Sequence, residues 1–178
     1  MGQRPLWLVG MMGAGKSAVG PLLARSLGRD FVDTDAEIET LAGTSVAQIF
    51  ANEGEASFRE RERAAIEALL GGDAVVALGG GAIGQPGVPA RLAESGTVIY
   101  LRATPATLLR RLGDCAGRPL LSALGPRARL ARLEALLAER RCAYETASIA
   151  IDTDGLAIEA VLEEISRRLA ARGEENGP

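Results

Sequence analysis

Short apolar runs alternate with longer amphipathic segments along most of this chain. Each apolar run is only a few residues long, as expected of strands buried on both faces of a parallel sheet. The longer segments carry apolar residues at helical spacing, as Val19, Leu23 and Leu27 do in the first of them. Strands that alternate with helices in this way predict a parallel sheet covered by helices.

The same pattern predicts where each element falls. Strands are predicted at residues 6–9, 31–33, 74–78, 98–101 and 149–151. Helices are predicted near residues 17–27, 55–70, 105–112, 127–144 and 156–171. A chain of 178 residues suits a single domain, which we place at residues 1–172, with a polar tail at 173–178 that we expect to be disordered.

The first apolar run leads into a phosphate-binding loop. Residues 10–17 read GMMGAGKS and match the motif G-x-x-x-x-G-K-[ST]. In such a loop, backbone amides cradle phosphate oxygens, the lysine reaches the β- and γ-phosphates, and the serine hydroxyl is a ligand of Mg²⁺. Lys16 is the only lysine of the chain, and it stands where the motif requires one. A strand before the loop and a helix after it complete the expected context, so we predict nucleotide binding here.

Two aspartates stand where the second apolar run ends. Asp33 and Asp35 are two residues apart, and ligands of open parallel sheets bind beyond the carboxyl ends of the strands. One carboxylate there can hold Mg²⁺ while the other accepts a proton from a substrate hydroxyl. A turn with an aspartate N-cap explains the same pair without a function. The phosphate loop one strand away favours the functional interpretation.

A run of three glycines follows the third apolar run directly. Gly79, Gly80 and Gly81 let the backbone approach a ligand closely and offer it amide groups. A permissive turn is the alternative interpretation of these residues.

Arginines stand at three places where they can meet an anion. Arg59 lies near the start of a charged helix, and Arg140 and Arg141 lie near the end of a long one, where one of the two can reach inward; a solvated surface position is the alternative for each of them. Arg118 falls in the longest stretch without regular periodicity, about residues 113–126. Such a stretch in a compact domain is typical of a lid, and its arginine can neutralise charge that develops on a transferring phosphoryl group.

Composition narrows the function classes further. The net charge is −3, and no basic run indicates nucleic-acid binding. No apolar stretch is long enough for a membrane span and no secretory signal is evident, so we expect a cytoplasmic protein with free thiols. The chain has no histidine, which excludes a histidine triad and a histidine zinc site. Proton transfer must therefore use a carboxylate, a lysine, a tyrosine or the substrate itself.

Taken together, these residues resemble the shikimate kinase family, from Gly10 to about Asp152. The matching pieces are the phosphate loop, DTDAEIE at residues 33–39, Gly54-Glu55 with Phe58-Arg59, the glycines at 79–81, RPLL at 118–121, and Arg140 four residues before Tyr144. The phosphate loop is shared by many kinases, whereas the other motifs are much more specific to this family.

The resemblance implies a fold and an activity. The fold is a P-loop NTPase-like three-layer sandwich, similar to nucleoside monophosphate kinases, with a five-stranded parallel sheet and helices on both faces. A substrate-binding region is implied at about residues 33–62 and a lid at about 113–126. The implied reaction moves the γ-phosphoryl group of ATP to the 3-hydroxyl of shikimate with Mg²⁺ as cofactor, in a monomer whose partners are small molecules.

The resemblance also implies residue roles. Nucleotide contacts are implied for Gly13, Ala14, Gly15, Lys16, Ser17, Ala18, Arg111 and Arg118. Shikimate contacts are implied for Asp35, Arg59, Gly80, Gly81 and Arg140. Magnesium contacts are implied for Ser17 and Asp33, and catalytic roles for Lys16, Asp35 and Arg118. One departure is the segment 152–155, which lacks an arginine that some relatives place near the adenine.

Two other functions fit parts of the sequence. A different small-metabolite kinase, such as one for gluconate, would also act on a carboxylate with hydroxyls, but the Asp33/Asp35 run and the triple glycine argue against it. A nucleotide-dependent switch would bind ATP or GTP without a small-molecule acceptor. The chain has no Asn-Lys-x-Asp guanine-reading element, because Lys16 is its only lysine.

Overall fold

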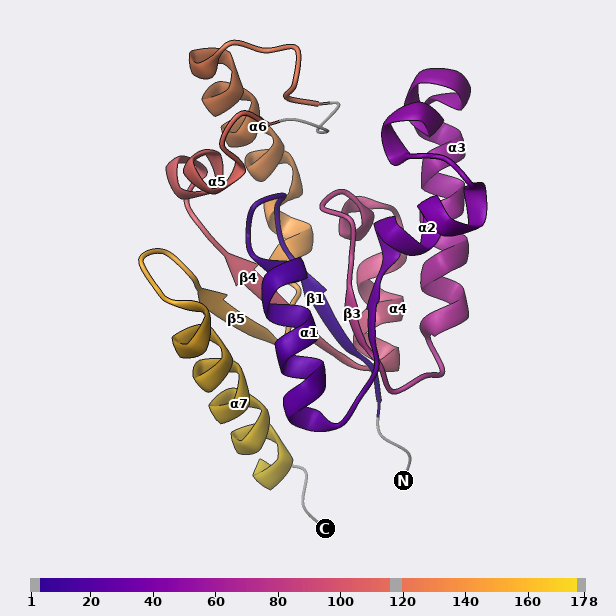
Figure 1. The fold of residues 1–178 in the computed structure, drawn as a ribbon. Helices are drawn as coiled ribbons and strands as arrows, with labels where there is room; N and C mark the ends of the chain where they lie inside the picture. Colours follow the sequence, from indigo (N-terminus) through magenta and orange to yellow (C-terminus); the bar gives the residue numbers. More distant parts are fainter. Residues whose placement is uncertain (1–3, 116–119, 176–178) are drawn as a thin grey trace.

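The computed structural model describes residues 4–115 and 120–175, and it shows a five-stranded sheet between two layers of helices (Figure 1). The strands are β1 (Leu6–Val9), β2 (Phe31–Asp33), β3 (Val75–Ala77), β4 (Thr97–Arg102) and β5 (Ile149–Asp152). The helices are α1 (Lys16–Leu27), α2 (Thr34–Ala42), α3 (Val46–Leu69), α4 (Val88–Ser95), α5 (Pro105–Leu112), α6 (Pro126–Tyr144) and α7 (Ile158–Glu175), with a short 3₁₀ helix η1 (Ala82–Gly84).

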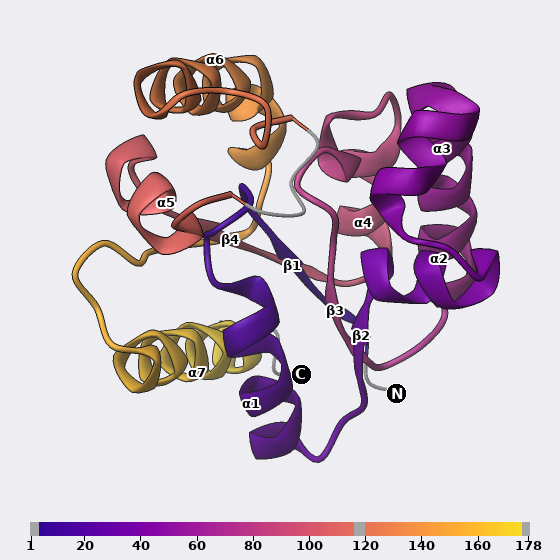
Figure 2. The ribbon, with the colours of Figure 1, turned by 45° about the horizontal axis from the view of Figure 1, so that its top comes forward.

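The strands pair in the order β2-β3-β1-β4-β5, and all of the pairs are parallel. Leu6 of the central strand β1 aligns with Val75 on one side and Thr97 on the other. Helices α1 and α7 lie on one face of the sheet, and α4 and α6 lie on the other, as two views agree (Figures 1 and 2). This arrangement confirms the predicted three-layer fold.

All five predicted strands are present, with ends that differ by no more than one residue. Two helices were not predicted, and both are short. In α2 the buried residues are Thr34 and Ile38, and in α4 they are Val88 and Leu92. One buried pair at i,i+4 is too little to show helical periodicity in the sequence.

Two helices are longer than predicted. Helix α3 consists of two segments that meet at Gly54; the second starts at residue 55, as predicted, and the first, which was not predicted, starts at Val46 with a capping box formed by Ser45 and Gln48. Gly54 kinks this helix with a φ of 85°, a left-handed conformation that suits glycine. Helix α7 continues to Glu175, so residues 173–175 are helical rather than part of a disordered tail. Residues 176–178 lie outside the described part.

The core divides into a large cluster around the sheet and a small one between α2 and α3. The small cluster holds Ile38, Ile49, Phe58 and Ala65. Glu39 ties the same two helices together, because its carboxylate accepts a hydrogen bond at 2.8 Å from the amide of Val46 at the start of α3. Helices α2 and α3 therefore form a lobe with a core of its own beside the carboxyl end of the sheet (Figure 1).

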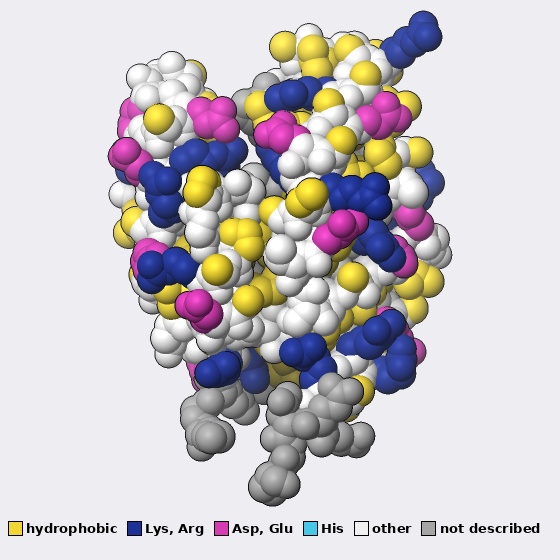
Figure 3. Space-filling view, turned by 180° about the vertical axis from the view of Figure 1, so that it is seen from behind, with side chains coloured by type: hydrophobic (Ala, Val, Ile, Leu, Met, Phe, Trp, Pro, Cys, Tyr) yellow, Lys and Arg dark blue, Asp and Glu magenta, His cyan; other side chains and the backbone are white. Residues whose placement is uncertain are grey.

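The surface carries charges of both signs. On the face seen from behind, basic side chains lie in several separate groups, many of them beside acidic ones (Figure 3). Within residues 4–115 and 120–175, none of the helices combines the length and the apolar character that a bilayer crossing needs.

Candidate active site

A cavity of about 760 Å³ opens beyond the carboxyl ends of β1, β2 and β3. From the phosphate loop and the start of α1, the cavity is lined by Gly13, Ala14, Gly15, Lys16, Ser17 and Ala18. From the rest of the chain, the predicted residues that line it are Asp33, Asp35, Arg59, Gly80, Gly81, Arg111 and Arg140. The fold thus brings residues from distant parts of the sequence to one place. Arg118 lies outside the described residues.

The phosphate loop owes its shape to glycines. Gly13 and Gly15 have φ values of 80° and 104°, which side-chain-bearing residues rarely adopt. Lys16 is the first residue of α1, is buried, and donates hydrogen bonds to the carbonyl oxygens of Gly10 at 2.7 Å and Met11 at 3.2 Å. The loop therefore holds a buried ammonium at the N-terminal end of a helix, where an anion is favoured by both the charge and the helix dipole.

Asp33 joins the phosphate loop to α2. Its Oδ2 accepts a hydrogen bond from the Ser17 hydroxyl at 2.9 Å, and its Oδ1 accepts one from the Asp35 amide at 3.1 Å as the N-cap of α2. The N-cap interpretation of Asp33 is confirmed, and its magnesium role stays a prediction. A hydroxyl and a carboxylate at hydrogen-bond distance form an oxygen-only donor set, which fits the preference of Mg²⁺.

Asp35 and Glu62 converge on the backbone of Gly79. A Cβ atom on Gly79 would lie 2.6 Å from Asp35 Oδ1 and still closer to Glu62 Oε1. Glu62 is buried, with 1% of its surface exposed. Burial raises the pKa of the Glu62 carboxyl, the charge of Arg59 acts against that rise, and the charge of Asp35 adds to it. Glycine at position 79 is what allows two carboxylates to meet the loop.

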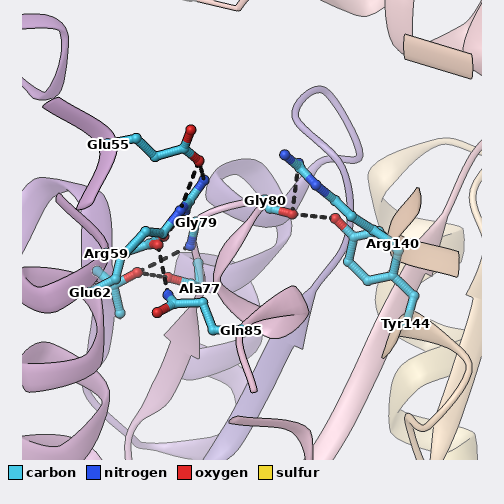
Figure 4. Close-up of polar contacts among 10 residues, drawn as sticks. Glu55, Arg59, Glu62, Ala77, Gly79, Gly80, Gln85, Arg140 and Tyr144 are labelled. Carbon is cyan, nitrogen blue, oxygen red and sulfur yellow. Dashed lines mark hydrogen bonds and ion pairs between the residues drawn. The ribbon is translucent and has the colours of Figure 1, made fainter. Parts of the chain in front are cut away.

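Arg59 is held in place by two glutamates of its own helix (Figure 4). Its Nε and Nη2 donate to Glu55 Oε1 at 3.2 and 2.9 Å, and its Nη1 donates to Glu62 Oε2. A guanidinium has five N–H groups, and within the described residues these bonds use three of them. One N–H group therefore remains on Nη1 and one on Nη2. Together these two groups can bind a carboxylate bidentately.

Arg140 and Tyr144 converge on the carbonyl oxygen of Gly80 (Figure 4). Arg140 Nη1 donates to it at 3.1 Å, and the Tyr144 hydroxyl donates to it at 2.5 Å. Tyr144 is fully buried and stacks on Tyr100, with 4.8 Å between the ring centroids. Burial raises the pKa of Tyr144, so the hydroxyl stays protonated and remains a donor. The C-terminal turn of α6 thereby fixes the middle of the triple glycine.

Arg111 contacts the phosphate loop, where its Nη1 donates to the Ala14 carbonyl at 3.4 Å, and is anchored by the segment after β5. Its two terminal nitrogens donate to the Thr153 hydroxyl at 2.9 Å and to the Thr153 carbonyl at 2.5 Å. Asp154 accepts hydrogen bonds from the Thr104 amide and hydroxyl at the start of α5, the helix that carries Arg111. The segment 152–155 has no arginine of its own, unlike that of some relatives, but it positions Arg111 of α5.

The sequence did not single out Glu62 or its partner Gln85. Glu62 lies three residues after Arg59, a spacing that places both on one face of a helix. That signal was hidden, because residues 59–63 alternate arginine and glutamate and read as a solvated face. Nothing in the sequence indicates the contact between Gln85 and Glu62.

Comparisons with known proteins point to one family. A profile of the family described as "Shikimate kinase" matches residues 12–170. The chain is 43% identical over 170 residues to a shikimate kinase of Chlorobium chlorochromatii, covering 92% of this chain and 90% of the relative. It is 47% identical over 171 residues to one of Symbiobacterium thermophilum, covering 94% and 97%.

The chain belongs to the shikimate kinase family. A solved structure supports this at the level of the fold: the shikimate kinase of Acinetobacter baumannii, determined in complex with shikimate, has a TM-score of 0.89 and 37% sequence identity, covering 96% of this chain and 94% of that one. As a member of this family, the chain is an ATP-dependent kinase with ATP as co-substrate.

Proposed function

We propose that this chain transfers the γ-phosphoryl group of ATP to the 3-hydroxyl of shikimate, forming shikimate 3-phosphate and ADP. The observation that carries the proposal is a single cavity lined both by Lys16 with its glycine loop and by Arg59 and Arg140. Shikimate is a small anion with vicinal hydroxyls, so its recognition calls for cations beside a carboxylate that can bind hydroxyls.

Arg59 and Arg140 form the proposed clamp for the shikimate carboxylate. Among the described residues, Arg59 keeps two N–H groups on its terminal nitrogens without a partner, and the two glutamates that it contacts fix its orientation before the ligand arrives. Arg140 is held against the carbonyl of Gly80 at 3.1 Å, which places the second cation beside the same glycines. A clamp that is ordered in advance loses less conformational entropy on binding.

Asp35 is the proposed partner of the reacting hydroxyl. It lies on the first turn of α2, beside Gly79 and within the cavity. The chain has no histidine, and we assign to the carboxylate of Asp35 the tasks of orienting the 3-hydroxyl and accepting its proton. The proton moves from the hydroxyl oxygen to Asp35 as that oxygen bonds to the γ-phosphorus and the bond to the β-phosphate oxygen breaks.

On the nucleotide side, Lys16 and the loop amides are proposed to hold the β- and γ-phosphates. Ser17 and Asp33 would hold Mg²⁺, which supplies positive charge to the phosphate oxygens when it is bound. Arg111 is proposed to contact the nucleotide from its anchor on Thr153. Arg118 is proposed as the lid arginine on the basis of its sequence motif alone. A cytoplasmic location and a monomeric state stay predictions.

Gly81→Ala should weaken shikimate binding selectively. A Cβ atom on Gly81 would lie 2.6 Å from Arg59 Nη2 and 2.8 Å from Nη1, so the guanidinium must move out of the clamp. We expect the KM for shikimate to rise about 10-fold or more, as for the loss of a bond to a charged group, with the KM for ATP unchanged.

Gly84→Ala is the matched control for this prediction. Its Cβ would lie 3.9 Å from the nearest atom, Arg140 Cγ, which is an ordinary contact. Steady-state kinetics of both variants decide the matter. An equal effect of the two substitutions, or an unchanged KM for shikimate in Gly81→Ala, would remove Arg59 from the proposed clamp.

The acceptor is tested with purified protein, Mg-ATP and a panel of small hydroxy acids, with ADP release as the readout. We expect turnover with shikimate and none above background with gluconate. Calorimetry with shikimate separates a kinase from a nucleotide-dependent switch, because a switch should give no heat. Phosphorylation of gluconate without phosphorylation of shikimate would overturn the proposal.

A further inference from the structure

Gln85 lies behind the proposed carboxylate clamp rather than in the cavity. Its side-chain amide donates a hydrogen bond at 3.0 Å to Glu62 Oε2, the oxygen that also accepts from Arg59 Nη1 (Figure 4). Glu62 and Arg59 line the cavity, whereas Gln85 is absent from the described residues that line it. Gln85 is itself buried, with 8% of its surface exposed.

We propose that Gln85 is a positioning residue for substrate binding, which acts through Glu62 on the orientation of Arg59. This inference rests on the proposed function, because it assigns the clamp of Arg59 to the shikimate carboxylate. Three side chains then connect a residue outside the cavity to the ligand. Gln85 orients Glu62 by a hydrogen bond, Glu62 orients Arg59 in the same way, and Arg59 binds the ligand.

Glu62 needs a hydrogen-bond partner that fixes its position, because the charges around it act on its carboxylate in opposite directions. Arg59 and Arg140 attract its charge, while Asp35 repels it from across the loop at Gly79. Burial removes the water that would otherwise solvate the carboxylate. The amide of Gln85 is a neutral donor. It stabilises the carboxylate of Glu62 and adds no positive charge that would compete with Arg59 for the anionic ligand. It also fixes Oε2 at the point where Arg59 must meet it.

The orientation of the Gln85 amide follows from its neighbour. Gln85 Oε1 is buried and has no hydrogen-bond partner within the described residues. The reversed amide would turn this oxygen toward the carboxylate of Glu62, and two acceptors would then face each other. The observed orientation keeps the bond to Glu62 and leaves one buried acceptor of Gln85 unpaired, which is costly.

The backbone holds Gln85 firmly enough for this role. Gln85 follows η1, its amide donates to the Ala82 carbonyl at 3.1 Å, and its own carbonyl accepts from the Val88 amide at 3.2 Å. Pro86 comes next and restricts Gln85 to the extended conformation it has, with φ −74° and ψ 141°. The turn that follows the triple glycine therefore positions Gln85, and through Glu62 it also supports Arg59.

Gln85→Met tests this connection, since methionine has a similar length and lacks the amide. We expect the KM for shikimate to rise about 5- to 10-fold, as for a lost bond to a charged partner, with kcat and the KM for ATP within about 2-fold of wild type. Gln85→Leu serves as a second variant if Gln85→Met folds poorly. Ser95→Ala is the control, because it removes the hydroxyl that accepts a hydrogen bond of 3.0 Å from Trp7 Nε1, away from the cavity.

A double-mutant cycle with Glu62→Gln separates this role from simple destabilisation. If Gln85 acts through Glu62, adding Gln85→Met to Glu62→Gln should leave the KM for shikimate nearly unchanged. Additive effects, or an unchanged KM in Gln85→Met beside an active wild type, would overturn the inference and leave the proposed function intact. Failure of the proposed function itself would appear as a wild-type protein that does not phosphorylate shikimate.

Discussion

Asp35→Asn should abolish turnover and leave ATP binding in place. The substitution keeps the size of the side chain but removes its charge and its capacity to accept a proton, so the acceptor hydroxyl loses its base. We expect kcat to fall about 10³-fold, within the range for a lost general base. The Kd of ATP should stay within about 2-fold, because Lys16 and Ser17 are untouched.

The control for Asp35→Asn is Glu37→Gln, the same chemical change two residues along α2. Glu37 is exposed and lies on the side of α2 that faces a separate small groove with α3. Steady-state kinetics and calorimetry with ATP measure both variants. Weakened ATP binding with normal turnover in Asp35→Asn would contradict the role proposed for Asp35.

Lys16→Met should remove both nucleotide affinity and turnover. Lys16 is the only lysine, is buried at the start of α1, and points its ammonium into the loop proposed to cradle the phosphates. No other lysine can substitute for it. We expect kcat/KM for ATP to fall at least about 10²-fold, as when one charge-stabilising donor is lost from a transition state.

Lys16→Arg separates charge from shape at the same position. A planar guanidinium is larger than an ammonium and should not fit between the carbonyls of Gly10 and Met11, so we expect this variant to be nearly as impaired. Arg25→Met, at the exposed end of the same helix, is the control for lost positive charge on α1. Full activity of Lys16→Arg would mean that charge alone suffices at this position.

The single lysine also permits a chemical measurement. An amine-selective reagent should modify only Lys16 and the N-terminal amine, so mass spectrometry can follow Lys16 alone. ATP should protect Lys16 from modification, whereas shikimate alone should protect it little. Equal modification with and without ATP would argue against its contact with phosphate.

The sequence predicted the sheet well because buried parallel strands read as unbroken apolar runs. Val75 and Val76, for example, are fully buried and lie between β1 and β2 in the sheet. Helices α2 and α4 were not predicted, because each has too few buried residues to show a helical period in the sequence. Capping and a kink at Gly54 set the extent of α3, and a hydrophobic pattern carries neither signal clearly.

Most of the site residues that the sequence predicted line the cavity, whereas the residues that support them were not predicted. Lys16, Asp35 and Arg59 stand in motifs with a chemical reason for each residue. Glu62 and Gln85 act, in this account, only through other side chains, and they come from segments more than 20 residues apart. Contacts between such segments depend on tertiary packing, which spacing along the chain does not reveal.

The most direct test of the account is to identify the product formed from shikimate and Mg-ATP by phosphorus–proton correlated NMR. The account predicts one product, with phosphorus coupled to the proton on carbon 3, formed in equal amount with ADP. Phosphate attached at another hydroxyl, or ADP released together with free phosphate while shikimate stays unmodified, would contradict it.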